Sequence, residues 1–242
     1  MKKQATVFDE IVNSRRSVRI YDANAPFDEE VVMRSLERAT LAPNSSNLQL
    51  WEFYRVKTPS KKKELAKYCL GQRAATTANE LIVFVTRKDK WNKHAKFVLE
   101  EAKKQFPSKI GKKEQLIIDY YSKVIPTLYF SDPLDLVGAF KKVAANVGGM
   151  FQPLPKQVTA TDIRIVVHKS CALAAQTFML SMSAEGYDTC PMEGFDSDKV
   201  KKFLNLPASA EICMVVSVGK AAPEGIYGDR VRIPKEEIIK VI

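Results

Sequence analysis

Residues that build metal sites, disulfide frameworks and histidine-based triads are scarce in this sequence. The 242 residues include two histidines, His94 and His168, which lie far apart in the chain. The four cysteines form no CxxC pair and are scattered: Cys69, Cys171, Cys190 and Cys213. Scattered cysteines in a chain of this size are typical of buried, reduced thiols in a cytoplasmic protein. We therefore expect a cytoplasmic protein with no metal site and no Ser-His-Asp triad.

Long hydrophobic runs are also missing. The longest strongly apolar run, Leu81–Val85, is far shorter than a membrane span. The basic start, Met1–Thr6, is followed by no apolar segment, so no secretory signal is predicted. The sequence shows no internal repeat, no GxGxxG motif and no P-loop. We expect a single domain over residues 1–242, with no attachment to a membrane.

The excess of positive charge is regional. The net charge is +10, and residues 57–113 hold 16 Lys or Arg against 5 Asp or Glu. Most of these cations are lysines on helical segments, without the regular aromatic residues that stack on bases. The pattern is therefore typical of a solubilising surface, and no nucleic-acid partner is expected. A weak affinity for polyanions remains an alternative.

Hydrophobic periodicity predicts helices packed on a small sheet. Asp28 is a good N-cap for a helix whose apolar stripe continues towards Pro43. Strands are predicted over Trp51–Val56, Leu81–Thr86 and Ile212–Val218, and the middle one is apolar enough to be buried on both faces. The strongest helix spans the stripe from residue 163 to residue 182. This order indicates an α+β fold.

Further helices are predicted from capping residues. Ser60 and Ser197 are expected to cap two of them, and Asp132-Pro133 is expected to open a third. Residues 91–159 contain several helical patterns and the loop 148–155.

The segment Arg15-Arg16-Ser17-Val18-Arg19 places three guanidinium groups and a hydroxyl within five residues. A guanidinium offers a planar fork of donors that matches phosphate oxygens, and it stays charged at any working pH. The segment can therefore hold a phosphorylated cofactor. A solvated basic turn at the end of a helix is the alternative.

Three other segments have compositions suited to a ligand site. Residues 42–49 (Ala-Pro-Asn-Ser-Ser-Asn-Leu-Gln) form a polar loop after a helix, although turn chemistry alone also favours Asn and Ser. Residues 190–196 (Cys-Pro-Met-Glu-Gly-Phe-Asp) contain a glycine that permits close approach of a planar ligand, or form a plain connection. Residues 228–234 place Arg230 and Arg232 on one side of an extended segment, which is otherwise a surface strand.

These four segments, in this order, resemble the FMN-dependent nitroreductase family over roughly residues 6–90 and 160–235. The resemblance implies a three-layer α+β fold, with a small, mostly antiparallel central sheet wrapped by helices. It also implies a homodimer with a long central helix at the interface and FMN bound between the subunits. Residues 91–159 are then a variable helical insertion that caps the active site.

The resemblance also implies roles for individual residues. Arg15, Arg16, Ser17 and Arg19 match the motif that holds the phosphate and the pyrimidine edge, and Arg19 is expected nearest the ring. Pro43, Asn44, Ser45 and Asn47 match the loop that reaches FMN from the other subunit. Gln72, just before the second strand, is expected at the ribityl chain or ring. Met192, Glu193 and Gly194 match the segment whose backbone faces flavin N5, and Arg230 and Arg232 match a phosphate-binding pair.

Four positions depart from the family pattern. Asn44 and Leu50 stand where members commonly have Ser and Pro. The lysine that some members place near Ala74, and a tryptophan before the long dimer helix, have no equivalent. The changes at Asn44 and Leu50 are mild, whereas the missing lysine and tryptophan bear on the contacts to the ring edge and to the substrate.

The function implied is hydride transfer from NADH or NADPH to FMN and then to a small electron-poor acceptor, such as a nitroaromatic or a quinone, in a ping-pong cycle. Flavin N5 performs this chemistry, so no catalytic side chain is expected. An arginine near the ring stabilises the negative charge of the reduced cofactor, and Arg19 is the candidate. The alternatives are an activated alkene as acceptor, or a non-catalytic basic protein that binds flavin or polyanions.

Overall fold

A four-stranded antiparallel sheet forms the centre of the protein. The computed structural model describes residues 3–132 and 134–242. The strand order is β1-β2-β4-β3, and every neighbouring pair is antiparallel. The strands are β1 (Trp51–Val56), β2 (Glu80–Thr86), β3 (Asp188–Met192) and β4 (Glu211–Gly219). The predicted α+β class with a small antiparallel sheet is confirmed.

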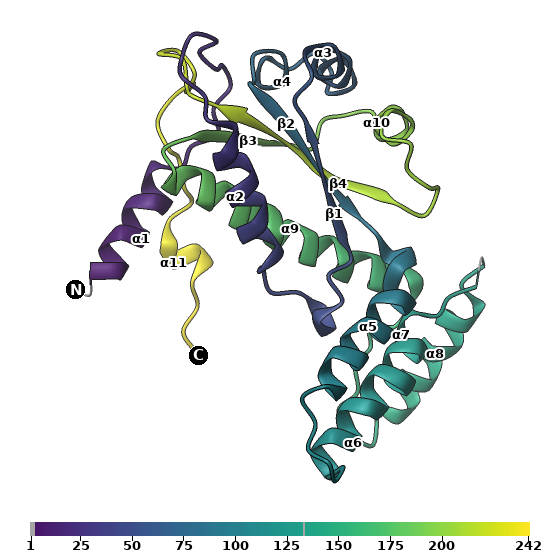
Figure 1. Ribbon diagram of the computed structural model, residues 1–242. Coiled ribbons are helices and arrows are strands. Elements are labelled where there is room, and N and C mark those ends of the chain that lie inside the picture. The colour runs from purple at the N-terminus through teal and green to yellow at the C-terminus, as the bar shows by residue number, and fades with distance from the viewer. Residues whose placement is uncertain (1–2, 133) are drawn as a thin grey trace.

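Helices cover both faces of this sheet, which gives three layers (Figure 1). The residues of β2 are all buried, as a strand between two helical layers requires. On one face, α2 (Glu29–Thr40) and α9 (Ala160–Ala184) pack over Ile82, Phe84 and Val216. The opposite face carries α3 (Pro59–Tyr68), α4 (Arg73–Thr76) and α10 (Ser197–Phe203). The implied three-layer fold is confirmed.

The long helix α9 runs through the middle of the molecule (Figure 1). Thr159 and Asp162 form a capping box at its start. By length and composition alone α9 could cross a membrane, although the sequence contains no long run of strongly apolar residues. Half of its most apolar stretch is buried inside the fold, which identifies α9 as a core helix, whereas Ile165 and Leu173 on its outer side are exposed.

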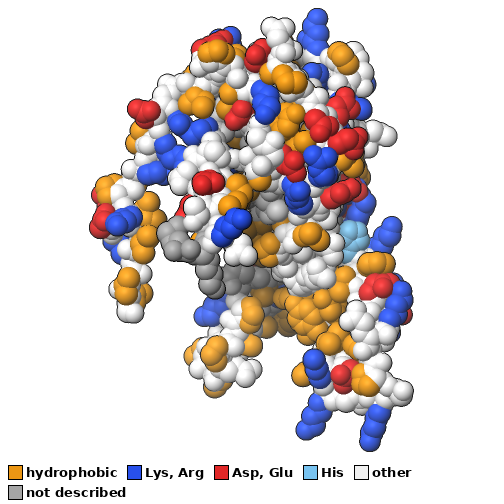
Figure 2. Space-filling model, turned by 60° about the vertical axis from the view of Figure 1, so that its left-hand side comes forward, with side chains coloured by type: hydrophobic (Ala, Val, Ile, Leu, Met, Phe, Trp, Pro, Cys, Tyr) orange, Lys and Arg blue, Asp and Glu red, His pale blue; other side chains and the backbone are white. Residues whose placement is uncertain are grey.

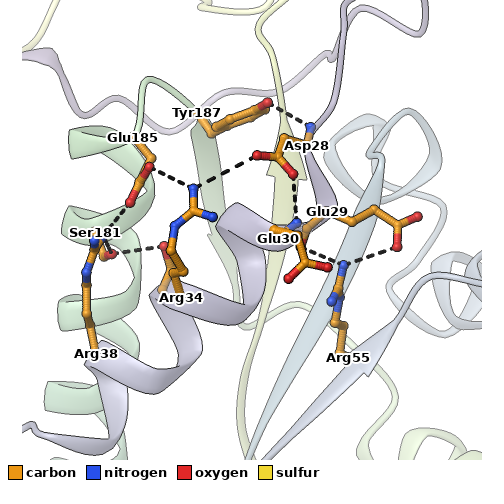
Figure 3. A network of polar contacts seen from close by, with 10 residues as sticks. Asp28, Glu29, Glu30, Arg34, Arg38, Arg55, Ser181, Glu185 and Tyr187 are labelled. Carbon is orange, nitrogen blue, oxygen red and sulfur yellow. Dashed lines mark hydrogen bonds and ion pairs between the residues drawn. The ribbon is translucent and has the colours of Figure 1, made fainter.

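A network of ion pairs fixes α2 to the end of α9 and to the sheet (Figure 3). Glu185 accepts hydrogen bonds from Arg38 (2.6 Å) and Arg34 (3.2 Å). On the sheet side, Arg55 of β1 donates to the backbone carbonyl of Glu29 in α2 at 2.9 Å, and it also makes two bonds to the buried Glu80 of β2, at 2.6 and 2.7 Å. The backbone N–H of Asp28 donates to the Tyr187 hydroxyl at 2.8 Å. This network keeps the α2 layer in one register on the sheet.

The remaining helices lie outside the three layers. In Figure 1 the helices α5, α6, α7 and α8 project from one end of the sheet, and α1 and α11 lie towards the other. The predicted helical character of residues 91–159 is confirmed. These elements are α1 (Lys3–Ser14), α5 (Trp91–Lys103), α6 (Lys112–Asp119), the π-helical η3 (Tyr120–Val124), α7 (Ile125–Tyr129), α8 (Leu136–Gly148), α11 (Lys235–Ile238) and the 3-10 turns η1 (Ser45–Asn47) and η2 (Lys88–Lys90).

Three predicted helix starts are wrong. The helix expected to begin at Ser60 has Thr58 as its N-cap residue, because the fixed φ of Pro59 suits the first helical turn. Asp196, not Ser197, caps α10 and accepts from the backbone of Lys199. The helix expected at Asp132-Pro133 begins after Asp135, and Pro133 lies outside the described residues.

One predicted connection is also different. Residues 190–192, expected in a connection, belong to the edge strand β3, where Pro191 is tolerated because an edge position can lack an N–H. Residues 228–234, for which a surface strand was the alternative, belong to no strand of the described structure.

Candidate active site

The first arginine segment is held against the edge of the sheet. Ser17 pairs in parallel with Thr189 of β3, and the N–H of Val18 donates to the carbonyl of Thr189 at 3.1 Å. Val18 is fully buried in the core, so it fixes the segment, while Arg15 and Arg19 on either side remain half-buried. The backbone therefore presents the flanking guanidinium groups along the outer side of β3.

The second group of arginines, which begins 215 residues after Arg15, meets the first arginine segment. Arg230 donates to the carbonyls of Asn13 at 3.0 Å and Arg15 at 2.5 Å, where α1 ends. In the other direction, the guanidinium of Arg16 donates to the carbonyl of Gly228. Carbonyls at a helix C-terminus have no partner within the helix, and an arginine there satisfies them and complements the helix dipole. These bonds bring the two arginine clusters together.

Together the two segments line an open cavity of about 340 Å³. Burial, and then the charges of Arg230 and Arg232, lower the pKa of Arg15. Within residues 3–132 and 134–242, none of the five arginines of this cavity pairs with a carboxylate within 4.0 Å. Such unpaired positive charge favours an anionic ligand. The cavity is lined by Arg15, Arg16, Ser17, Arg19, Ile226, Tyr227, Gly228, Asp229, Arg230, Val231 and Arg232.

A second group of predicted residues lies beyond the other end of β3. The Gln72 side chain donates to the carbonyls of Gly194 at 2.7 Å and Cys69 at 3.1 Å. Met192 is buried, whereas Glu193 and Gly194 are exposed beyond the strand. The expected place of Gln72 just before the second strand is wrong, because α4 lies between them. Gln72 nevertheless fixes the backbone of Gly194.

The two groups lie along one edge of the sheet. Thr189, beside Ser17, and Glu193 are four residues apart in extended chain, which corresponds to about 13 Å. The strand therefore places the arginine cavity and the exposed Glu193-Gly194 backbone at separate points of the same surface.

The polar loop 43–47 contacts α9 at a different point from the arginine segment. The N–H of Ser45 donates to the Ser170 hydroxyl of α9 at 3.2 Å, whereas Ser14, next to the arginines, bonds to Ser183 of the same helix at 2.9 Å. Thirteen residues of α-helix separate these two serines by about 20 Å. Pro43, Asn44, Ser45 and Asn47 are therefore distant from the arginine cavity of their own chain.

The backbone of this loop is strained but well supported. Ser46, Asn47 and Gln49 all have positive φ, near 50°. Asn44 accepts from the N–H of Gln49 at 2.8 Å, and the Tyr121 hydroxyl donates to the carbonyl of Ser46 at 3.0 Å. Left-handed residues held in this way are frequent at ligand-binding sites.

Sequence reasoning missed the cavity residues Ile226 and Tyr227. No repeated pattern marked them, and only their position just before the Arg230–Arg232 pair could have suggested a role. The hydroxyl of Thr189 was missed too, and among the described residues it is buried without a hydrogen-bond partner.

The sequence matches the model of the nitroreductase family over residues 12–220. Its relatives include YdgI of Bacillus subtilis, named among the NAD(P)H nitroreductases, at 29% identity over 93% of this chain and 94% of that protein. Another relative is the CLA biosynthesis enone reductase of Lactiplantibacillus plantarum, at 24% identity over 91% of this chain and 88% of that protein.

Solved structures share the fold. The nitroreductase ydfN of Bacillus subtilis superimposes with a TM-score of 0.73 at 26% identity, over 98% of this chain and 100% of that chain. A nitroreductase of Exiguobacterium sibiricum, solved in complex with FMN, gives a TM-score of 0.67 at 26% identity, over 97% of both chains.

Proposed function

The chain belongs to the nitroreductase family of NAD(P)H-dependent FMN oxidoreductases, and we propose which residues hold the cofactor and which acceptors it reduces. The observation that carries the proposal is the cavity in which Arg15, Arg230 and Arg232 converge without a carboxylate partner among the described residues. A phosphate dianion fits this donor set, because several guanidinium groups can each give it two hydrogen bonds.

In this proposal Arg15, Arg16, Ser17 and Arg232 contact the FMN phosphate, and Arg230 holds the backbone that shapes their cavity. Arg230 acts mainly through the backbone, because its own donors are engaged by the end of α1. Burial, and then the charges of Arg230 and Arg232, lower the pKa of Arg15, and an anion between Arg15 and Arg232 would offset this repulsion.

The ring of the cofactor is proposed to lie along β3, towards Gly194. When bound, FMN supplies a ring that accepts hydride from a reduced nicotinamide and passes it to the acceptor. Gln72 fixes the turn at Gly194, so that the backbone of Glu193 and Gly194 is presented in one orientation. Met192 packs in the core beneath this turn. Arg19, the remaining cation of the cavity, stabilises negative charge at the pyrimidine edge.

We propose that the site is completed by a second subunit. The loop of Pro43, Asn44, Ser45 and Asn47 lies too far from the arginines of its own chain, and a two-fold dimer about α9 would bring it to those of the partner. Exposed apolar side chains on α9 support this arrangement. Figure 2 shows hydrophobic side chains gathered low on one face, between segments that project from the body.

The proposed acceptors are small electron-poor molecules such as nitroaromatics and quinones, reduced in a ping-pong cycle in a cytoplasmic enzyme. Residues 91–159, within a single domain, are proposed to cap the site. An activated alkene is the second candidate, supported by the enone reductase among the relatives.

The test is spectroscopic. Purified protein is expected to be yellow, with an FMN spectrum that bleaches when NADH or NADPH is added without oxygen. Addition of a nitroaromatic, a quinone or an enone to separate samples then restores the colour of the oxidised flavin, and the relative rates rank the acceptors. Protein that cannot take up FMN, or bound FMN that neither nucleotide bleaches, would contradict the proposal.

A further inference from the structure

A cavity of about 510 Å³ lies between α3 and α4, and it shares no lining residue with the arginine cavity. The two helices lie side by side on the same face of the sheet (Figure 1). The floor of the cavity is apolar, because the small side chains of Ala66, Ala75 and Ala78 are buried there. Cavities of roughly 300–1,000 Å³ with mostly apolar walls are of the size that binds small molecules. The proposed flavin chemistry does not use this cavity.

Three lysines of α3 line the same cavity. They are Lys62, Lys63 and Lys67, and the last two are four residues apart, so they share one side of the helix. Lys63 and Lys67 are exposed, whereas Lys62 is half-buried. The stem of a lysine is apolar and packs on apolar surface, while its ammonium group stays in water. The cavity therefore combines an apolar floor with a cluster of positive charge.

Acidic side chains do not neutralise this charge within the described structure. Among residues 3–132 and 134–242, none of the three lysines has a carboxylate within 4.0 Å, although Lys61 on the same helix pairs with Glu64 at 3.5 Å. The Lys62 ammonium group donates instead to the backbone carbonyl of Ala78 at 2.9 Å. Burial lowers the pKa of Lys62, and the charge of Glu80 acts in the opposite direction. An anion in the cavity would offset the cost of burying this positive charge.

The shape of the cavity narrows the choice of ligand. The sequence predicts a solubilising surface for the lysine-rich region 57–113, with a weak affinity for polyanions as the alternative. A solubilising surface needs no cavity, and the phosphate backbone of a polyanion has no apolar part to cover the three alanines. Apolar floor and positive charge together fit a small molecule that has an apolar body and one anionic group.

The cavity borders the turn that carries Gln72. Helix α3 ends in a Schellman motif, in which the N–H of Gly71 donates to the carbonyl of Ala66 at 3.0 Å and Leu70 has a left-handed backbone, with φ of 58°. Gly71 lines the cavity, and a Cβ atom there would meet no atom within 4 Å, so open space lies beside it. The next residue, Gln72, donates to the Gly194 carbonyl at 2.7 Å. A ligand beside Gly71 is therefore one residue away from the bond that orients Gly194.

A second bond ties the same segment to α3. The N–H of Asp196 donates to the backbone carbonyl of Tyr68, in the last turn of α3, at 2.8 Å. Two hydrogen bonds therefore connect the wall of the cavity to residues 194–196, which the proposed function places near the flavin ring. Contacts of this kind can couple two sites, and a measured coupling is the evidence that they do.

We propose that this cavity binds a small amphipathic carboxylate, with its apolar chain or ring over the alanine floor and its carboxylate at Lys63 and Lys67. The bound ligand steadies the turn at Gly71 and, through Gln72, the backbone at Gly194. The binding site stands on the cavity alone, whereas an effect of the ligand on hydride transfer rests on the proposed function. The ligand is an effector and does not compete with the cofactor.

Calorimetric titration with decanoate tests the site. The full-length protein is expected to bind one decanoate per chain, with the same affinity in the presence and absence of FMN, because the two cavities share no lining residue. Inorganic phosphate has the charge without the apolar chain, and decyltrimethylammonium has the chain with the opposite charge, so neither should bind in this cavity.

Two double variants test the role of the lysines. Lys63→Gln with Lys67→Gln should weaken decanoate binding by about fivefold or more. Lys103→Gln with Lys104→Gln is the matched control, because it removes two lysines of α5 that pair with glutamates outside the cavity. This control should bind decanoate as the wild-type protein does.

Hydrogen exchange of the flavin-free protein measures the connection to Gly194 independently of the proposed function. Decanoate is expected to slow amide exchange at residues 70–72 and 194–196 by about fivefold. Gln72→Ala is expected to reduce the effect at residues 194–196 while decanoate binding is retained.

The wild-type measurements decide the proposal even if a variant fails to fold. Absence of saturable decanoate binding, displacement of decanoate by FMN, equal binding of phosphate, or equal affinity in the two double variants would overturn the site. Decanoate binding with unchanged exchange at residues 194–196 would overturn the effector role. Failure of the protein to take up FMN, with decanoate binding retained, would contradict the proposed function and leave the site supported.

Discussion

Arg230 donates to the backbone carbonyl of Arg15 at 2.5 Å, and so joins the segment after β4 to the end of α1. The same guanidinium bonds to Asn13 at 3.0 Å. Arg230 therefore shapes the cavity, whereas Arg15 and Arg232 leave their charge free for a ligand. Because Arg230 supports the backbone whereas Arg15 and Arg232 offer charge to a ligand, substitutions at these positions are expected to have different effects.

Arg230→Ala is expected to release the 226–234 segment. Hydrogen bonds from a charged donor contribute about 1.5–3 kcal/mol each, so FMN affinity should fall by roughly 10- to 100-fold. Chymotrypsin should also cut faster at the exposed Tyr227. Arg34→Ala, which removes a cation from α2 outside the cavity, is the matched control and should leave both measurements unchanged. An Arg230→Ala protein with wild-type affinity and wild-type proteolysis would contradict the structural role.

Gln72→Ala is expected to slow hydride transfer more than it weakens FMN binding. The side chain fixes the Gly194 carbonyl at 2.7 Å, and small errors of position reduce the rate strongly, here by about tenfold. Stopped-flow bleaching by NADH or NADPH measures the rate, and fluorescence titration measures FMN affinity. An affinity that falls as much as the rate would place Gln72 in cofactor binding instead.

Mixing two inactive variants tests whether the site is shared between subunits. One chain carries Arg15→Ala and Arg232→Ala, and the other carries Ser45→Trp, which fills the space at the loop. Random exchange makes half of the dimers mixed, and each mixed dimer contains one intact site, so about a quarter of all sites should bind FMN. Recovery of no sites, with exchange verified by native mass spectrometry, would indicate a site built from one chain.

The Arg55–Glu80 pair is expected to support the fold. Glu80 is buried, with contacts of 2.6 and 2.7 Å to Arg55. Arg55→Ala leaves this carboxylate unpaired and should lower the free energy of unfolding by about 3–5 kcal/mol. The double variant Arg55→Met with Glu80→Leu removes both charges and should be destabilised much less. Urea unfolding followed by circular dichroism measures both, and equal losses would show that the ion pair itself is not responsible.

The sequence predicted the elements whose signal is local. The aromatic strand Trp51–Val56 and the stripe of α9 were found because their periodicity reports burial directly. Strand β3 was missed because proline and glycine, here Pro191 and Gly194, commonly end a strand. Pro191 is compatible with a strand here because β3 lies at the edge of the sheet. The start of α8 was predicted too early along the chain. Asp132 lies before the helix, but its side chain accepts a hydrogen bond from the N–H of Val137 in the first turn.

The separate segments of the candidate site could be predicted from the sequence, but their arrangement in space could not. Each arginine cluster was visible as a local motif, and the family resemblance connected them. The bonds from Arg230 to Arg15 and from Gln72 to Gly194 join residues far apart in the chain, so no spacing rule could reveal them. Strand β4 has a β-bulge at Cys213. The bulge results from the register in which β4 pairs with β2, and the sequence of β4 alone does not specify that register.

Titration of flavin-free protein with FMN tests the proposed role of the arginine cavity most directly. We expect wild-type protein to bind one FMN per chain, with inorganic phosphate as a competitor, and Arg15→Ala with Arg232→Ala to lose binding by about 100-fold or more while its circular dichroism spectrum is retained. Equal FMN affinity in the wild-type and doubly substituted proteins would show that the phosphate is bound elsewhere.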